Sequence, residues 1–424
     1  MADVQPLRAL TYDPARFPDL GAVTAPPYDV IDPEQRTALL ARSPHNVVAI
    51  DLPLAVEEGE DPYAYAAEVF AEWQAQGVLV RDAEPALYAL AQDYTGPDGQ
   101  ERTRHGIFAR VRVEDYGPGR IRPHERTHPG PKEDRLRLTR ATRANLSPIF
   151  SLYDDPSGAA WLAVEPHTAA PPLGEVTDGD GTRHRLWRVA DPNTIEQVHE
   201  ALATAELLIA DGHHRYETAR VYAEEQGGGE GGHRYVLMCL VSLQDPGLTI
   251  FPTHRLVKGL TSDQHELLAT TLREHFDIER VEPGQLRPPD GDGPLTLGYI
   301  DSHFKQAFRL ELKDLEVPDR LLADRAPAYR RLDTAVLEAL ILERALGLSE
   351  DDISHMRGLE YARSGPEALE RVRSGAADAA FFMRATPVEQ VRDVAAAGEN
   401  MPPKSTYFFP KVLTGLLFHP LDEE

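Results

Sequence analysis

The segment Glu206–Glu225 restricts the fold of this chain more than any other part of its sequence. Residues Glu206–Ala210 predict a short buried strand, and a helical pattern begins directly after Gly212. A strand that passes into a helix through one glycine needs a tight turn, which glycine permits because it has no Cβ atom. Strand, turn and helix in this order are typical of α/β units. The sequence therefore predicts an α/β fold with a helix that begins at His213 and ends near Glu225.

Extended and helical patterns also alternate in the preceding part of the chain. Two extended runs, Ala86–Tyr94 and His105–Val113, are separated by a Gly-Pro-Asp-Gly turn and predict a β-hairpin. A long polar loop follows over Gly117–Lys132, and a helix is predicted over about Glu133–Asn145. The length of this loop is unusual for a simple connection and favours a functional role.

Three further elements are predicted from the spacing of apolar residues. Val47–Asp51 is predicted as extended, and Ala328–Ala345 as one helix. The pattern over Pro62–Gln76 predicts a helix with Tyr65, Val69 and Trp73 on one face.

The length of 424 residues predicts more than one domain, because one hydrophobic core usually serves about 100–200 residues. The helical and extended patterns restart at Thr261, and residues 283–294 contain many Pro, Gly and Asp residues. We therefore expect an N-terminal α/β region over residues 1–260 and a second, smaller α/β domain over residues 261–424.

The charge of the chain disfavours some classes of partner. Its 69 acidic and 44 basic side chains give a formal net charge of -25, which repels nucleic acid and anionic membrane surfaces. Only six of the basic residues are lysine, and this excess of arginine fits either phosphate recognition or the base composition of the genome. The single cysteine, Cys239, lies in an apolar run and predicts a buried strand residue. The sequence has no signal-peptide pattern and no apolar stretch of about 18 residues, so we expect a soluble cytoplasmic protein.

The sequence Asp211-Gly212-His213-His214-Arg215 is the strongest candidate for a functional site. The first N–H groups of a helix lack partners within the helix, and the positive end of the helix dipole also favours phosphate there. Arg215 can add a bidentate contact, and both histidines can donate hydrogen bonds or transfer protons. Asp211 can hold a metal-bound water or accept a proton, or it can simply cap the helix. Adjacent histidines point about 100° apart on a helix, so the pair alone is a weak zinc signal.

The polar loop supplies a second group of candidates. Glu125 can act as a general base on a substrate hydroxyl, and we expect His124, Lys132 and Arg135 to contact phosphates. A solvated polar loop without a function is the alternative for this segment.

Two further segments carry possible ligand-binding residues. Lys404, Ser405 and Thr406 can close over an anion, although no glycine-rich phosphate-binding loop precedes them. Near the N-terminus, Tyr28 or Asp29 can line a pocket, and a rigid connection made by the neighbouring prolines is the alternative.

Four short motifs resemble those of the bacterial domain-of-unknown-function 1015 family: Pro26-Pro27-Tyr28-Asp29-Val30-Ile31, Pro123-His124-Glu125, Ala210–Arg215 and Pro403-Lys404-Ser405-Thr406. This resemblance covers nearly the whole chain and implies no particular activity. The segment Asp211–Arg215 also resembles the phosphate-binding box of the ParB and sulfiredoxin fold, a group that includes a free-serine kinase with an acidic general base. The second resemblance implies a mixed-sheet core in which Gly212, His213, His214 and Arg215 bind nucleotide phosphates, with Glu125 as the base. Those domains are much smaller than this chain and leave its C-terminal third unexplained.

Together these residues predict a phosphotransferase that moves a phosphoryl group between a nucleotide and a small hydroxyl metabolite such as serine. We expect ATP or ADP as the nucleotide and Mg²⁺ to screen the phosphates, with Asp211 as the metal ligand. Two alternatives use the same residues: a metal-dependent hydrolase of a phosphomonoester such as phosphoserine, and a nucleotide-binding switch without turnover.

Overall fold

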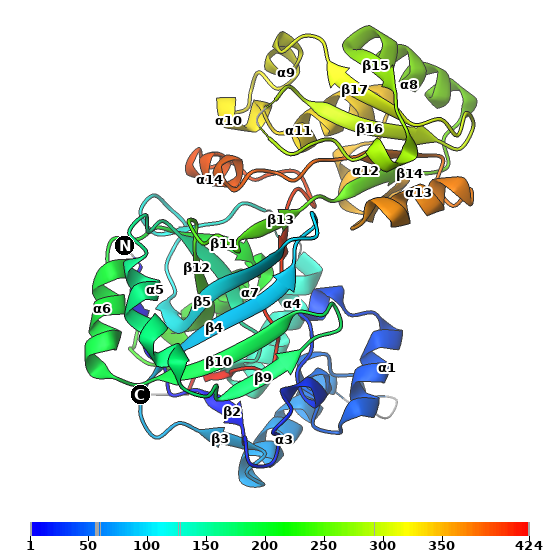
Figure 1. The fold of residues 1–424 in the computed structure, drawn as a ribbon. Coiled ribbons are helices and arrows are strands. Elements are labelled where there is room, and N and C mark those ends of the chain that lie inside the picture. Colours follow the sequence, from blue (N-terminus) through cyan, green and yellow to red (C-terminus); the bar gives the residue numbers. More distant parts are fainter. Residues whose placement is uncertain are drawn as a thin grey trace. The chain divides into compact units, whose positions relative to one another are not determined.

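The computed structural model describes residues 2–55, 59, 61–125, 127, 129–291 and 293–422. The chain forms two compact units (Figure 1). The first consists of Met1–Pro123, Thr127–Thr249 and Pro410–Glu424, and the second of His124–Arg126 and Ile250–Phe409. Helices and strands are mixed in both units, so the predicted α/β fold class is confirmed. Within the described ranges, none of the helices combines the length and the apolar character that a membrane span requires.

A mixed sheet forms the centre of the first unit. Its strands, in spatial order, are β6 (Ile121–Arg122), β11 (Leu207–Asp211), β8 (Ile149–Tyr153), β12 (Tyr235–Ser242), β5 (Glu101–Arg112), β4 (Leu87–Thr95), β10 (Arg183–Val189) and β9 (Gly174–Thr177). The short strand β1 (Val4–Gln5) also pairs with β5. β12 runs parallel to β8 and β11 runs parallel to β6, whereas the other neighbours are antiparallel. The predicted hairpin is confirmed as β4 and β5.

Helices cover one face of this sheet. Ile107 and Met238 on that face belong to a core that also includes residues of α5 (Ala159–Val164) and α6 (Pro192–Leu202). Figure 1 shows α5 and α6 side by side against the strands. Tyr216 of the next helix, α7, completes this core.

The opposite face of the sheet is also buried. Phe108, Phe150 and Cys239 are at most 1% exposed there, which agrees with the buried strand position predicted for the cysteine. Residues 410–421 cross this face, and β21 (His419–Pro420) in this segment pairs with β7 (Ala144–Asn145).

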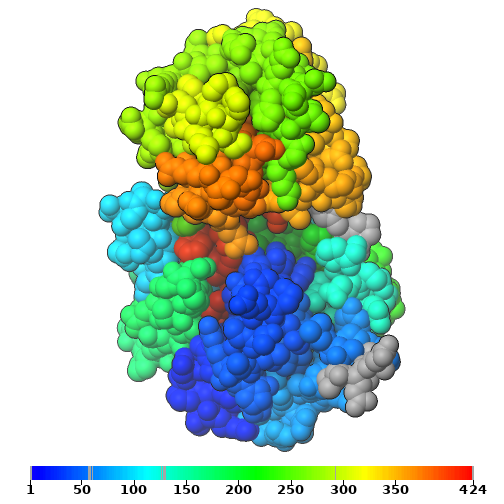
Figure 2. Space-filling model, turned by 90° about the vertical axis from the view of Figure 1, so that its right-hand side faces the viewer, coloured from blue at the N-terminus to red at the C-terminus, as the bar shows by residue number. Residues whose placement is uncertain are grey.

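Three helices of the first unit pack in sequence against one another. α3 (Pro62–Ala75) contacts α4 (Pro129–Thr142), and α4 contacts α7 (His213–Glu225). Figure 2 shows the N-terminal residues in blue beside the blue-green residues of the α4 region. Asp61 is the N-cap of α3, and its carboxylate accepts a hydrogen bond from the backbone N–H of Tyr63 (3.1 Å), which satisfies one of the free donors of the first turn. The remaining elements of this unit are β2 (Leu10–Tyr12), η1 (Leu20–Ala22), η2 (Tyr28–Val30), α1 (Pro33–Arg42), α2 (Val48–Asp51), β3 (Leu79–Arg81), η3 (Glu165–Ala169) and η4 (Gly232–Arg234).

The second unit contains a smaller sheet whose neighbouring strands are all antiparallel. Its spatial order is β15 (Phe276–Arg280), β17 (Phe308–Leu312), β16 (Thr296–Asp301), β19 (Ala379–Phe382), β14 (His254–Val257) and β18 (Leu359–Ala362). Two cores lie on its faces, one with α8 (Ser262–His275) and the π-helix η6 (Glu338–Ala345), the other with α13 (Gly365–Arg373). The other elements are β13 (Thr249–Phe251), η5 (Pro283–Gln285), α9 (Glu316–Leu321), α10 (Pro327–Arg330), α11 (Asp333–Leu337), α12 (Glu350–Ser354), α14 (Val388–Ala396) and β20 (Tyr407–Phe409).

Two predictions for the N-terminal part are wrong. Residues 48–51 form a helical turn rather than a strand, because Asn46 accepts a hydrogen bond from the N–H of Val48 (3.2 Å) and starts the turn. In α3 the buried residues are Ala66, Phe70 and Trp73, so the predicted face is displaced by one position over its first two turns. Tyr65, which was predicted to lie on one face with Trp73, is 38% exposed.

Other boundaries differ from the prediction because the deciding contacts are non-local. α4 begins at Pro129, four residues before the predicted start, and the predicted helix 328–345 is divided into α10, α11 and η6. The first unit ends at Thr249 rather than at residue 260, and it also includes Pro410–Glu424. That last segment pairs with strands of the first unit, which no local pattern in the sequence reveals.

The face of α3 can be tested by comparing Phe70→Ala with Tyr65→Ala. Phe70 is 4% exposed, so its loss should lower the free energy of unfolding by about 3–5 kcal/mol. Tyr65→Ala should cost less than about 1 kcal/mol, because most surface substitutions have small effects. Urea unfolding of both variants measures the difference, and similar losses would favour the face predicted from the sequence.

Candidate functional site

Asp211 is the last residue of β11, and a β-bulge determines the face of the sheet on which it lies. Leu207 and Ile209 belong to the core on the helix-covered face, and regular alternation would place Asp211 there as well. The register against β8 shifts between Ile209 and Asp211, so that Asp211 lies opposite Phe150. The extra residue, Ala210, therefore moves the carboxylate to the other face.

Gly212 makes the predicted turn between β11 and α7. Its φ of 99° lies in the left-handed region, which residues with a Cβ atom rarely adopt. A Cβ atom there would also lie 3.0–3.2 Å from the guanidinium of Arg215. α7 has no side-chain cap, because its N-cap residue is Gly212, and the carboxylate of the preceding Asp211 accepts from Arg215 Nη2 (2.5 Å) and from Lys411 Nζ. The alternative role of Asp211 as a helix cap is therefore wrong.

Two buried polar side chains on the sheet fix the backbone beside Lys411. Gln92 Nε2 donates to the carbonyl of Lys411 (3.0 Å), and Arg104 Nη2 donates to the carbonyl of Pro410 (2.5 Å). Arg104 Nε also donates to Gln92 Oε1 (3.0 Å), and its guanidinium lies 4.4 Å from the ring centre of Phe150. Burial lowers the pKa of Arg104 to about 10. These two contacts fix the backbone from which the Lys411 side chain reaches Asp211.

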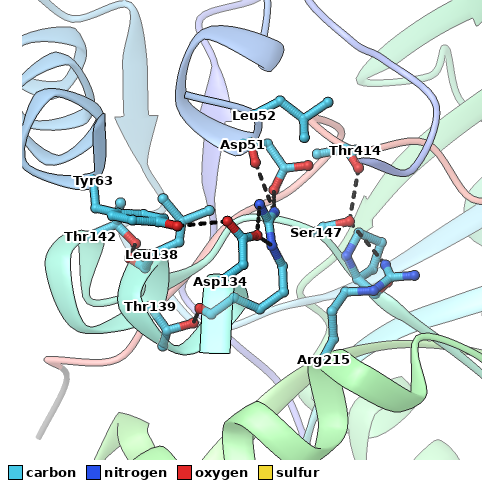
Figure 3. Close-up of polar contacts among 12 residues, drawn as sticks. Asp51, Leu52, Tyr63, Asp134, Leu138, Thr139, Thr142, Ser147, Arg215 and Thr414 are labelled. Carbon is cyan, nitrogen blue, oxygen red and sulfur yellow. Dashed lines mark hydrogen bonds and ion pairs between the residues drawn. The ribbon is translucent and has the colours of Figure 1, made fainter. Parts of the chain in front are cut away.

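Arg215 connects this ion pair to the loop before β8 (Figure 3). Its Nη1 donates to Ser147 Oγ (3.0 Å) and to the carbonyl of Pro148. Ser147 Oγ in turn lies 2.8 Å from Thr414 Oγ1 in the C-terminal segment. The Arg215 side chain is 10% exposed, and within the described part of the chain its Nε has no hydrogen-bond partner. A buried donor in this state can receive an acceptor atom of a ligand or of water.

Arg135 of α4 lies in a second group of charges. Its Nη1 donates to Asp51 Oδ1 (3.1 Å) and to the Asp51 carbonyl (2.8 Å), and its Nε donates to Asp134 Oδ2 (2.8 Å). The guanidinium lies 4.2 Å from the ring centre of Tyr28. Burial raises the pKa of Tyr28 to about 12, although Arg215 and Arg135 act against this rise. Tyr28, Arg135 and Arg215 therefore share one electrostatic environment.

A cavity of about 40 Å³ lies among these groups, and its wall includes Asp51, Arg135, Ser147, Arg215 and Thr218. A space of this size holds roughly three water molecules or another group of a few atoms. Burial raises the pKa of Asp51, and this effect outweighs the opposing influence of Arg135 and Arg215. The carboxyl group is thus placed to exchange a proton within the cavity.

Cationic side chains outnumber the buried carboxylates that contact them. We call four of them the basic cluster: Arg104, Arg135, Arg215 and Lys411. The buried carboxylates in direct contact with the cluster are Asp51 and Asp211, and Asp134 beside Arg135 is 42% exposed. Burial raises the pKa of Asp211, but Lys411 and Arg215 outweigh it and hold that pKa well below its ordinary value. Asp211 is therefore ionised at neutral pH.

Seven of the predicted site residues belong to the first unit: Lys132, Arg135, Asp211, Gly212, His213, His214 and Arg215. Asp211, Arg135 and Arg215 lie at the basic cluster as described. His213 is 4% exposed and its charge influences Asp211, whereas His214 is partly exposed. The carbonyl of Lys132 accepts from Thr218 Oγ1 (3.4 Å), which links the start of α4 to α7.

The other predicted site residues belong to the second unit: His124, Glu125, Lys404, Ser405 and Thr406. His124 is fully buried, and its Nε2 lies 2.9 Å from Thr406 Oγ1 and 4.0 Å from Glu125 Oε1. Ser405 is buried and donates to the carbonyl of Pro402 (2.7 Å). Two motifs that are about 280 positions apart are thus brought together inside this unit.

Sequence reasoning missed four residues of the site: Asp51, Arg104, Ser147 and Lys411. Lys411 is one of only six lysines, which was a usable signal. Asp51 ends an apolar run that was interpreted as a strand, and Arg104 immediately precedes the predicted strand. A charged residue adjoining an apolar run suggests a buried partner, but the sequence does not identify that partner.

The metal role predicted for Asp211 does not fit the site. Both of its carboxylate oxygens are engaged by cations, Oδ2 by Arg215 and Oδ1 by Lys411. Across the described ranges, no group of three or more His, Cys, Asp or Glu side chains is arranged to hold a metal ion.

Three of the four motifs lie within a match to a known protein family. Residues 4–335 match the family model described as a protein of unknown function, DUF1015. The chain belongs to this family. The match contains the Tyr28, His124 and Asp211 motifs of DUF1015, and it ends before Lys404. Among the curated proteins, no sequence matches the chain.

A comparison with solved structures matches, among others, the free serine kinase in complex with AMP. It has 14% identity and a TM-score of 0.37, and the match covers 72% of this chain and 86% of the kinase. A conserved hypothetical protein from Pyrococcus furiosus matches with 14% identity and a TM-score of 0.34 over 72% of this chain and 90% of its own. SbnI with C-terminal truncation from Staphylococcus aureus matches with 11% identity and a TM-score of 0.34 over 72% and 85%. Scores this low transfer neither a fold nor an activity, so the ParB and sulfiredoxin core stays a prediction for this DUF1015 member.

Lys411→Met should destabilise the first unit most strongly at neutral pH. The substitution removes one of two cationic partners of a buried carboxylate and should cost about 3 kcal/mol. The ion pair depresses the pKa of Asp211 below its unfolded value of about 4. Its stabilisation is therefore complete above about pH 4 and is lost as the pH falls through the lower folded value. Urea unfolding at pH 7 and pH 3 should show the cost shrinking at pH 3.

Lys258→Met is a matched control for this experiment. Lys258 pairs with Glu360 at the surface and is 52% exposed, so its loss should cost less than about 1 kcal/mol. A loss from Lys411→Met that is equally small, or one that does not change with pH, would contradict the stabilising role of the buried pair.

Proposed function

We propose that the basic cluster binds a phosphate group of a small phosphorylated metabolite or nucleotide, and that the protein transfers a phosphoryl group between a nucleotide and a small hydroxyl metabolite. The observation that carries this proposal is the excess of four cationic side chains, each at most 15% exposed, over the two similarly enclosed carboxylates that contact them, Asp51 and Asp211. Buried charge without compensation is costly, and a bound anion offsets that cost. Three of the four cations are arginines, whose planar fork matches the oxygens of a phosphate.

The net charge of the whole chain makes this local excess more informative. At a formal charge of -25 the protein repels anions in general, so an anionic ligand must be attracted by a local field. Two buried arginines, Arg104 and Arg135, and the largely enclosed Arg215 belong to this one cluster. The local distribution therefore favours phosphate recognition here.

Two buried guanidinium atoms support an acceptor ligand more directly. Arg215 Nε and Arg104 Nη1 are both buried, and neither has a hydrogen-bond partner within the described part of the chain. Buried donors are nearly always paired in folded proteins, so each indicates an acceptor that is supplied by a ligand or by water. The 13-residue helix α7 begins beside Arg215, and the positive end of its dipole adds to the attraction for an anion.

The cavity beside Asp51 indicates which part of a substrate is bound deepest. Its volume of about 40 Å³ accepts a group of a few atoms but not the ring system of a nucleotide. We assign this cavity to the phosphoryl group that is transferred, with ATP or ADP as the nucleotide. Mg²⁺ usually keeps several waters and binds substrate phosphates through few protein ligands, so it enters this proposal as a companion of the nucleotide and not as an ion held by Asp211.

Two carboxylates are candidates for the base that accepts the proton of the hydroxyl group. Asp51 faces the cavity, and the raised pKa that burial gives it suits a proton acceptor. Glu125, predicted from the sequence, belongs to the second unit and lies beside His124. We propose Asp51 as the base of the first-unit site, and the role of Glu125 stays a prediction.

Phosphate binding is tested first by thermal unfolding with ATP, ADP, CTP, serine, phosphoserine and phosphate, each with and without Mg²⁺. A ligand at about 100 times its dissociation constant should raise the melting temperature by about 5 °C or more. Arg215→Ala should abolish a nucleotide shift, and Arg215→Lys should retain part of it, because lysine keeps the charge without the fork.

Arg183→Ala controls for the loss of an arginine elsewhere in the same unit. Arg183 pairs with Glu175 and is 50% exposed, so this variant should keep the full shift. A response to phosphoserine without any response to nucleotides would favour the hydrolase. Shifts that are equal in all four proteins would exclude the basic cluster as the binding site.

The base is identified by comparing Asp51→Asn with Glu125→Gln in a coupled assay of phosphoryl transfer to serine. Loss of a general base should lower the turnover rate by about 10²–10⁴-fold. Because each amide keeps the shape of the acid, nucleotide binding should remain in the variant that lacks the true base. A large loss in Glu125→Gln alone would overturn the assignment of Asp51.

A further inference from the structure

A second cavity lies within the second unit, and none of the residues that line it belongs to the basic cluster. It has a volume of about 510 Å³ and lies between α8 and the strands β15, β16 and β17. We call it the α8 cavity. Small-molecule sites usually have volumes of about 300–1,000 Å³, so this space accommodates a whole small molecule.

The sequence of α8 explains why a space remains between this helix and the sheet. Ser262, His265, Ala269, Leu272 and neighbouring residues at helical spacing form the stripe of α8 that borders the cavity. Three of these four named residues, Ser262, His265 and Ala269, carry a small or polar side chain rather than a large apolar one that would fill the space. The helix is nevertheless held on the sheet, because Leu272 belongs to the core that includes the strands.

The strands supply an apolar floor in two rows. Ile278 lies opposite Leu310, and Tyr299 lies opposite Phe308, and all four side chains line the cavity. Apolar surface of this kind gains roughly 25 cal/mol for each Å² that a ligand removes from water. The floor therefore favours a ligand with an apolar body.

Phe304 gives the mouth of the cavity an exposed aromatic ring. It is 71% exposed, and the turn between β16 and β17 fixes its backbone, because Asp301 Oδ1 accepts from its N–H (2.6 Å). The N–H of Lys305 also donates to the carbonyl of Asp301 (3.0 Å). An aromatic ring on a fixed backbone beside a cavity offers a planar contact surface to a ligand.

The charges around the α8 cavity select the polar end of the ligand. Two carboxylates line it, Asp301 and Glu266, together with one guanidinium, that of Arg273, and the imidazoles of His265 and His303, which are counted here as neutral. Asp301 is 5% exposed, and burial raises the pKa of Tyr299 beside it, so the phenol stays neutral. The excess charge is negative, which is opposite in sign to that of the basic cluster.

We propose that the α8 cavity is a second ligand site, which binds a small molecule with an aromatic body and a cationic amine. The apolar floor and Phe304 contact the aromatic body, and the carboxylates of Glu266 and Asp301 attract the amine. This site is independent of the proposed phosphotransfer, because none of its lining residues belongs to the first unit.

Three probes of nearly equal size test this inference on the full chain: phenethylamine, 2-phenylethanol and 3-phenylpropionate. They share the phenylethyl body and differ in the charge at its end. Titration calorimetry or saturation-transfer NMR should give the tightest binding for the amine, weaker binding for the alcohol and the weakest for the carboxylate. A difference of about three- to tenfold between amine and carboxylate is expected for one partly exposed charge contact.

Variants of α8 locate the binding. Ala269→Trp should fill the cavity and abolish binding of the amine, whereas Thr270→Trp, at an exposed position outside the lining, should leave it unchanged. Glu266→Gln keeps the shape of an exposed side chain and should reduce the preference for the amine without affecting the alcohol. Equal binding of the three probes, no binding of any, or unchanged binding in Ala269→Trp would each overturn the proposal.

Discussion

The ion pair between Asp211 and Lys411 joins two parts of the first unit that are 200 positions apart in the sequence. Each of the two charged groups is positioned by a separate feature of the fold. The bulge at Ala210 turns the carboxylate toward the face that the C-terminal segment crosses, and Gln92 and Arg104 fix the backbone that carries the ammonium. Without the bulge or without the fixed backbone, a charge would remain buried without compensation, which costs several kcal/mol. Arg215, which also contacts Asp211, connects this pair to Ser147 and Pro148 in the loop before β8.

The parts of the site that could be predicted are those whose signals are local. α7 has the predicted bounds, His213–Glu225, because an apolar run, one glycine and a helical pattern follow one another directly. Asp51 was missed for a physical reason: an apolar run of four or five residues fits a buried helical turn as well as a strand. The role of Lys411 could not be predicted, because its partner is determined by the tertiary fold and not by any neighbour in the sequence.

The division into units also shows how far proximity in the sequence can mislead. Glu125 and Lys132 are only seven positions apart and were assigned to one site, yet Glu125 belongs to the second unit and Lys132 to the first. His124 instead contacts Thr406, from a motif near the other end of the chain. The family model could confirm membership without resolving this, since its match ends before that motif. Motifs of one family can thus serve separate parts of the structure.

The passage of residues 410–421 across the sheet has a consequence for the order in which the protein is completed. Synthesis on the ribosome delivers the strands of the first unit, and then the whole of residues 250–409, before Lys411 emerges. Until Lys411 emerges, Arg215 is the cationic partner of the Asp211 carboxylate. A carboxylate with one cationic partner is stable only if its face of the sheet stays open to solvent. We therefore expect the nascent first unit to remain loosely packed over this face until residues 410–421 have emerged, and to reach its full stability only then.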